Sequence, residues 1–100
     1  MNGNRYILGI DGGGTSTVGY LFNEKGETIN KSSVDGTNLS LYGELSINRL
    51  IGLMNSLCEE SNLSLNEISA IGMGLAGISD LNQKDMLLKK IEQLNILNKT

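Results

Sequence analysis

The sequence of 100 residues contains no histidine and no tryptophan, and it has a single cysteine, Cys58. The absence of histidine excludes histidine-based catalysis within the chain. One cysteine cannot form an internal disulfide and cannot supply a multi-cysteine metal site. A reducing compartment, the cytoplasm, is therefore the expected setting.

Long apolar runs and basic blocks are also missing. No apolar run reaches the roughly 20 residues that a membrane-spanning helix needs, and the first residues lead into a strand-like run instead of a signal peptide. The 8 basic and 11 acidic residues give a formal charge of −3, without a basic stripe. Neither a membrane nor a nucleic acid is expected as a partner. The apolar share of 39% and the charged share of 19% are ordinary for one globular domain.

Apolar periodicity predicts the secondary structure of most of the chain. Three strand-like runs joined by short turns suggest an antiparallel meander. These runs cover residues 5–10, 16–22 and 27–34. A helix is predicted over 43–61, because its apolar positions recur every three or four residues.

The second half of the chain is predicted to add a fourth strand and a second helix. Ser64 and Glu67 match a capping box for a short turn, and a fourth strand is predicted over 68–75. A second helix, starting at Ser79 or Asp80, carries an apolar stripe. The stripe consists of Leu87, Leu88, Ile91 and Leu94. The order β-β-β-α-β-α predicts an α/β fold with a mixed sheet and helices packed on it.

The most informative segment is DGGGTS at residues 11–16, between the first two predicted strands. Successive glycines let backbone amides point into one concavity, where they can bind an anion. The phosphate-facing residues would be Gly12, Gly13, Gly14, Thr15 and Ser16. A P-loop is excluded because Thr15 stands where that motif needs lysine. A dinucleotide fingerprint is excluded because a strand follows instead of a helix.

Asp11 sharpens the interpretation of this loop. A carboxylate repels a phosphate by roughly 3 kcal/mol per charge pair at about 5 Å and an effective dielectric of about 20. A site that holds Mg²⁺ with the phosphates benefits from the carboxylate, because hard cations prefer such oxygens, often through water. The alternative is a plain glycine-rich hairpin with Asp11 as a turn residue.

Residues 7–29, ILGIDGGGTSTVGYLFNEKGETI, closely resemble the first phosphate segment of the superfold shared by actin, hexokinase-type sugar kinases and Hsp70. The triple glycine before Thr15 is similar to the branch of N-acetylglucosamine kinase and the BadF/BadG/BcrA/BcrD ATPase family. Two further segments agree with that branch. DGTN at 35–38 stands where these kinases have a sugar-contacting loop, and IGMGLAGI at 71–78 resembles a strand that ends in a small-residue corner.

The resemblance implies a ribonuclease H-like fold, ATP and Mg²⁺ as cofactors, and an amino sugar as substrate. Asp11 would orient Mg²⁺ through water, the loop of residues 12–16 would cradle the phosphates, and Asn38 would hydrogen-bond the sugar. Asn38 could equally be a local turn or cap residue. No catalytic base is assigned in this chain, because the catalytic Asp of the family is expected beyond Thr100.

Residues 1–100 are thus expected to be the N-terminal part of the first domain of a two-domain kinase. The piece alone is expected to be inactive and to self-associate, and the full-length enzyme to be a homodimer. Two alternatives are an ATPase activator of a dehydratase or reductase system and a nucleotide-sensing regulator on the same fold. The identity of the sugar, N-acetylglucosamine, N-acetylmuramic acid or glucosamine, stays open.

Gly72, Gly74 and Gly77 fit the pattern G-x-G-x-x-G. The pattern also needs an acid at a strand end about 20 residues later, whereas Glu92 lies in a predicted helix. We interpret the glycines as a strand end packed against the cleft. A parallel strand pair built on them around a crossover helix would favour a dinucleotide site.

Overall fold

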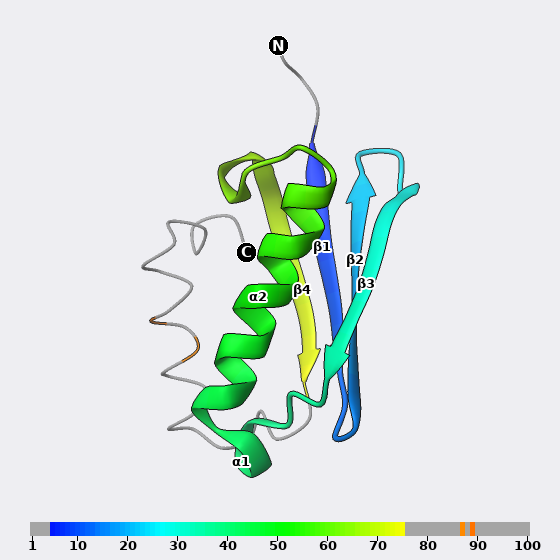
Figure 1. Cartoon of the computed structure of the whole chain (residues 1–100). Coiled ribbons are helices and arrows are strands. Elements are labelled where there is room, and N and C mark those ends of the chain that lie inside the picture. The colour runs from blue at the N-terminus through cyan, green and yellow to red at the C-terminus, as the bar shows by residue number, and fades with distance from the viewer. Residues whose placement is uncertain (1–4, 76–86, 88, 90–100) are drawn as a thin grey trace.

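Three strands, two helices, a 3₁₀ turn and a fourth strand follow one another in the computed structural model, which describes residues 5–75, 87 and 89 (Figure 1). In chain order its elements are β1 (Tyr6–Gly12), β2 (Ser16–Asn23), β3 (Thr28–Asp35), α1 (Leu39–Tyr42), α2 (Glu44–Glu60), the 3₁₀ turn η1 (Leu65–Glu67) and β4 (Ile68–Leu75). The predicted strands and the first long helix are confirmed to within two residues at each end. The predicted second helix lies outside the described residues, apart from Leu87 and Lys89.

The strands form one mixed sheet in the order β3-β2-β1-β4. β1 pairs with β2 and β2 pairs with β3, both antiparallel, which confirms the predicted meander. The tight turn between β2 and β3 places Gly26 at a φ of 83°, a conformation that favours glycine.

β4 runs parallel to β1, with Gly9 opposite Gly72 and Asp11 opposite Gly74. The parallel pair that was expected to favour a dinucleotide site is thus present, but its glycines do not lie where such a site needs them. A dinucleotide fingerprint needs its glycines in the turn from a strand into a helix. Gly72 and Gly74 instead lie inside β4, where they pair with β1.

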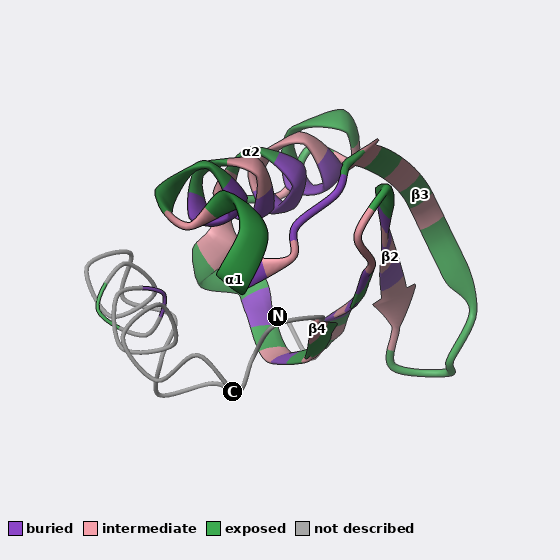
Figure 2. Cartoon of the chain, turned by 90° about the horizontal axis from the view of Figure 1, so that it is seen from below, coloured by how far each residue is buried: buried purple, intermediate pink, exposed green. Residues whose placement is uncertain are grey.

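The core lies between α2 and one face of the sheet (Figure 2). Leucine and isoleucine side chains from alternate strand positions meet the apolar stripe of α2. Their fully buried members include Leu8, Leu21, Ile47, Leu50, Leu53, Met54 and Leu57. Helix and sheet approach closely at Gly19, where a Cβ atom would lie 2.9 Å from Leu57 Cδ1. This close contact fixes the helix over the centre of the sheet.

Two short features complete the described part of the chain. The capping box predicted at Ser64 and Glu67 is present at η1. The helix α1 was missed by the periodicity analysis because four residues are too few for a period. It is defined by its ends: the side chain of Asn38 caps it, and Gly43 ends it at a φ of 54°.

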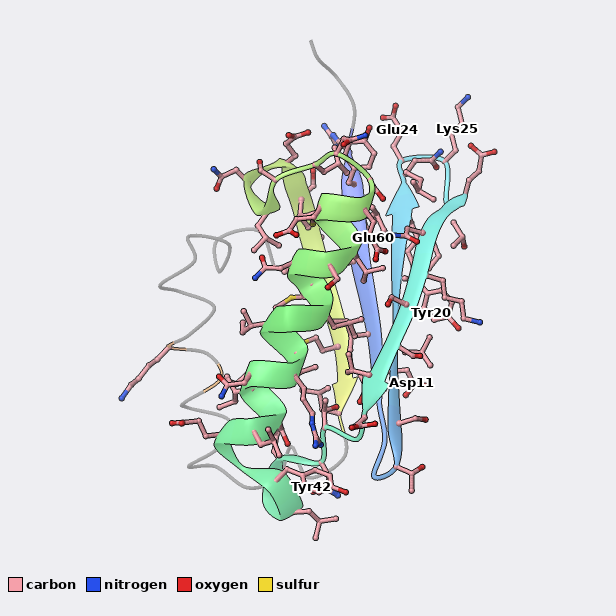
Figure 3. All side chains as sticks on the ribbon, in the orientation of Figure 1. Asp11, Tyr20, Glu24, Lys25, Tyr42 and Glu60 are labelled. Carbon is pink, nitrogen blue, oxygen red and sulfur yellow. The ribbon has the colours of Figure 1, made fainter. Side chains whose placement is uncertain are left out.

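The other face of the sheet is not covered by any described element. Asp11 and Tyr20 stand on this face (Figure 3). The Tyr20 and Phe22 rings stack there at 5.9 Å, and Lys31 lies over Tyr20. Among the described residues, no helix is long and apolar enough to cross a membrane.

Candidate functional site

The two loops that the sequence singles out lie at the same end of the sheet. The turn of residues 13–15, which we call the glycine loop, joins β1 to β2, and residues 36–38 lead from β3 into α1. Figure 1 shows the β1–β2 turn and α1 side by side at the lower end of the molecule. Segments about 20 residues apart in sequence therefore form one surface.

The glycine loop is a hairpin turn closed by a hydrogen bond from the Gly13 amide to the Ser16 carbonyl, at 2.9 Å. The Gly13 amide is therefore used within the turn. In the described part of the chain, the amides of Gly14 and Thr15 make no backbone hydrogen bond. Thr15 and Ser16 are exposed. The groups that can meet an anion are thus the amides of Gly14 and Thr15 and the two hydroxyls.

None of Gly12, Gly13 and Gly14 has a positive φ, so left-handed backbone is not the reason for glycine at these positions. A Cβ at Gly12 would collide with Thr37 Oγ1 and lie 2.8 Å from Leu75 Cδ2. A Cβ at Gly14 would meet nothing within 4 Å. The loop is therefore packed underneath at Gly12 and open at Gly14, where a ligand can approach.

Direct contacts join the glycine loop to residues 36–38. The Thr37 amide donates to the Gly13 carbonyl at 3.0 Å. Beneath it, the hydroxyls of Thr17 and Thr37 share a hydrogen bond of 2.7 Å, and both residues are fully buried. Gly36 lies so close to Gly14 that a Cβ at residue 36 would stand 2.6 Å from the Gly14 carbonyl carbon. The sequence predicted both loops but not this contact.

Asp11 is exposed at the carboxyl end of β1, two residues before the glycine loop turns. The ion pair found within residues 5–75, 87 and 89 joins Asp35 to Arg49, so no basic side chain there neutralises Asp11. The same residues contain no group of three acidic, histidine or cysteine side chains that could hold a metal alone. A single free carboxylate fits a cation whose other ligands are phosphate oxygens and water.

Asn38 caps α1 through its side-chain oxygen, which accepts a hydrogen bond of 3.1 Å from the Leu41 amide. The local role considered for this residue is therefore present. The backbone carbonyl of Asn38 accepts from Ser46 Oγ at 2.9 Å, which fixes the residue on α2 as well. The side-chain amide nitrogen makes no hydrogen bond within the described chain. A held side chain with a remaining donor can still contact a hydroxyl group of a ligand.

Tyr42 and Arg49 were missed by the sequence analysis. The Tyr42 hydroxyl donates to the Gly14 carbonyl at 2.9 Å, and Arg49 donates to the Gly36 carbonyl at 2.7 Å. The Arg49 guanidinium also lies 5.0 Å from the centre of the Tyr42 ring. Neither residue belongs to a motif, and no pattern in the sequence indicates that they reach back to the loops.

Solved structures similar to this chain include a proposed N-acetylglucosamine kinase from Chromobacterium violaceum. The match has a TM-score of 0.69 at 24% identity, and it covers 85% of this chain and 30% of that one. Gluconate kinase from Lactobacillus acidophilus matches with a TM-score of 0.58 at 20% identity, covering 73% of this chain and 16% of that one. The fold is therefore that of the actin and hexokinase-like sugar kinases.

Sequence comparisons define the family, within this fold, to which the chain belongs. The model of the BadF/BadG/BcrA/BcrD ATPase family matches residues 8–99, so the chain belongs to that family. Among curated proteins, glucosamine kinase GspK from Vibrio cholerae serotype O1 is 29% identical over 80 residues. The match covers 80% of this chain and 27% of that enzyme. The chain thus spans about a quarter of the length of the kinase it resembles.

Proposed function

We propose that this chain is the N-terminal part of the first domain of an ATP-dependent kinase that phosphorylates an amino sugar. The observation that carries the proposal is the contact between the glycine loop and residues 36–38, through the Thr37 amide and Gly36. A kinase must hold the γ-phosphate beside the acceptor hydroxyl, and these loops form one continuous surface. The likeness to a glucosamine kinase supports an amino sugar such as glucosamine or N-acetylglucosamine.

The chemical roles follow from the positions of the groups. The amides of Gly14 and Thr15, with the hydroxyls of Thr15 and Ser16, are proposed to bind the ATP phosphates. The amide group of Asn38 is proposed to donate to a sugar hydroxyl. Phosphoryl transfer depends mainly on such positioning and on charge stabilisation. The general base is expected from a segment after Thr100.

Asp11 is proposed to orient the Mg²⁺ that accompanies ATP. When bound, this ion would neutralise charge on the phosphates during transfer. Asp11 is exposed, has no basic partner in the described chain and lies next to the glycine loop. Its carboxylate is therefore available to the ion or to the water molecules that surround it.

The substitution Asp11→Asn in the full-length protein tests this function. We expect turnover to fall at least 100-fold with amino sugar and ATP at saturating Mg²⁺, while the affinity for the sugar stays within about twofold. The reason is that an ion-orienting carboxylate acts mainly in the transition state. Steady-state kinetics and calorimetry provide the two numbers. Near wild-type turnover would remove Asp11 from the site, and a wild-type protein that phosphorylates no amino sugar would overturn the kinase assignment.

A further inference from the structure

Tyr42 and Arg49 connect the two loops from outside. Tyr42 is the last residue of α1, and Arg49 lies on α2, yet both donate to loop carbonyls. The Tyr42 hydroxyl reaches the Gly14 carbonyl at 2.9 Å, and an Arg49 nitrogen reaches the Gly36 carbonyl at 2.7 Å. The guanidinium also lies 5.0 Å from the Tyr42 ring centre, within the range of a cation–π contact. We call these two side chains the Tyr42–Arg49 bracket.

The bracket acts on backbone that would otherwise be poorly fixed. Glycine loses more conformational freedom on ordering than any other residue, so a turn with Gly13 and Gly14 is costly to hold in one shape. A Cβ at Gly14 would meet nothing within 4 Å, so no side chain packs on that side of the turn, while the Gly14 carbonyl itself lies against Gly36. The hydrogen bond from Tyr42 therefore acts together with Gly36 to restrain the Gly14 peptide.

The same two residues are tied to the Asn38 region. Asn38 caps α1, the helix that ends at Tyr42, and the Tyr42 amide donates to the Asn38 carbonyl at 3.0 Å. Arg49 holds Gly36, two residues before Asn38, and makes a 3.9 Å ion pair with Asp35. A ligand that fixes Asn38 therefore also fixes the Tyr42 hydroxyl, and through it the Gly14 carbonyl.

We propose that Tyr42 and Arg49 are positioning residues that couple the two loops, so that the amino sugar and ATP each strengthen the binding of the other. This inference rests on the proposed function. Once one ligand has reduced the remaining motion of the bracket, the protein loses less conformational entropy when the second ligand binds. The coupling is reciprocal, because linkage requires each ligand to change the affinity of the other by the same factor.

The substitution Tyr42→Phe in the full-length protein removes one hydroxyl and keeps the ring on which Arg49 stacks. The measurement is the coupling factor: the dissociation constant of a non-hydrolysable ATP analogue without sugar, divided by the constant with saturating glucosamine or N-acetylglucosamine. Loss of one hydrogen bond should lower this factor about 2- to 10-fold. Arg49→Lys should lower it by a similar factor, because an ammonium group cannot both donate to Gly36 and stack in the guanidinium geometry.

Tyr20→Phe is the matched control. It removes a tyrosine hydroxyl on the open face of the sheet, where the described contacts of Tyr20 are with Phe22 and Lys31. The control should keep the wild-type coupling factor. Amide exchange of residues 13–15 without ligand gives a second readout, and it should rise for Tyr42→Phe but not for Tyr20→Phe.

The outcomes separate this inference from the function on which it rests. If the wild-type enzyme phosphorylates an amino sugar but shows a coupling factor near one, the inference is wrong and the function stands. The same holds if Tyr42→Phe and Arg49→Lys keep the full factor. A uniform loss of stability and of both single-ligand affinities in Tyr42→Phe would mean that the residue only supports the fold. A wild-type protein that transfers no phosphate to either sugar would contradict the proposed function itself.

Discussion

Gly12 and Gly14 are two positions apart and have different reasons to be glycine. Gly12 is packed beneath the loop, against Thr37 and Leu75. Gly14 has open space on the side where a Cβ would point, and its φ is not positive. A methyl group at residue 14 is therefore compatible with the fold. If the methyl group lowers activity, it does so by crowding a bound ligand.

We predict that Gly14→Ala leaves the thermal unfolding midpoint of the full-length protein unchanged or slightly higher and weakens ATP binding roughly 5- to 150-fold. The affinity estimate is the about 1–3 kcal/mol cost of forcing an extra methyl group into a close contact. Gly12→Ala should instead lower the free energy of unfolding by about 1–3 kcal/mol, through collision with the packed Leu75 and Thr37. Calorimetric binding and thermal unfolding of both variants give the comparison. Unchanged ATP affinity in Gly14→Ala would place the phosphates elsewhere.

Asn38 combines a structural and a proposed ligand role, and two substitutions separate them. Asn38→Ser keeps a capping oxygen but loses the amide donor, whereas Asn38→Ala loses both. We expect both variants to weaken sugar binding by about 1–3 kcal/mol, and only the alanine variant to lose about 0.5–2 kcal/mol of stability. Calorimetry with the sugar and thermal unfolding provide the data. Sugar binding at the wild-type level in Asn38→Ser would leave Asn38 with its capping role alone.

Cys58, the single cysteine of the sequence, is buried and forms no disulfide. It is 2% exposed on the inner face of α2. Burial, followed by the nearby charges of Glu67 and Glu59, raises the pKa of the thiol above its ordinary value. The thiol therefore stays protonated at neutral pH and is a poor nucleophile, since the thiolate is the reactive form.

At the scale of the elements, the fold could be predicted where one physical rule decided the outcome. The apolar residues of α2 recur with the period of a helix, so they lie on one face of the helix, and that face is buried. β4 begins and ends at the predicted residues. Helix α1 could not be predicted, because only its capping by Asn38 and Gly43 defines it.

The candidate site, too, could be predicted from the sequence only in part. The glycine loop could be found because three successive glycines are unusual for a hairpin, whereas residues 35–38 were assigned to the site only through the resemblance to the kinase family. The hydrogen bond between Thr37 and Gly13 joins residues 24 positions apart. No local sequence pattern indicates a contact between residues so far apart in the sequence. Tyr42 and Arg49 were missed for the same reason. Their roles depend on how α1 and α2 lie against the loops, which is a tertiary property.

The packing of α2 on β2 makes a prediction for two glycines in different surroundings. A Cβ at Gly19 would lie 2.9 to 3.1 Å from Leu53 and Leu57, which are both buried. Gly19→Ala should therefore cost about 1–3 kcal/mol of stability. Gly52 is exposed on α2 with nothing within 4 Å, so Gly52→Ala should add about 0.5–1 kcal/mol through helix propensity. Thermal unfolding of the full-length variants should show shifts of opposite sign, and a stable Gly19→Ala would show that α2 can move away from the sheet.

At the scale of the whole molecule, the described part of the chain is a sheet covered on one side (Figure 2). α2 buries the inner face, whereas Ile7 and the stacked Tyr20 and Phe22 lie on the outer face. Among the described strands, β4 forms one edge of the sheet. Unpaired strand edges and exposed apolar faces both promote association between chains.

We predict that the 100-residue chain, produced on its own, forms dimers or larger species at moderate concentration and transfers no phosphate to an amino sugar. Ile7 is 40% exposed on the outer face, next to Phe22 and Ala70 in the sheet. Ile7→Lys should therefore shift the chain toward the monomer, because a charge on this face must lose its hydration when a second copy covers it. Leu41→Lys is the control, since Leu41 is 69% exposed on α1, away from the sheet face. Light scattering over a range of concentrations measures the mass of each species. A monomeric wild-type chain would show that the outer face and the β4 edge do not promote association. Phosphorylation of glucosamine by the isolated 100-residue chain would contradict the view that the base lies beyond Thr100.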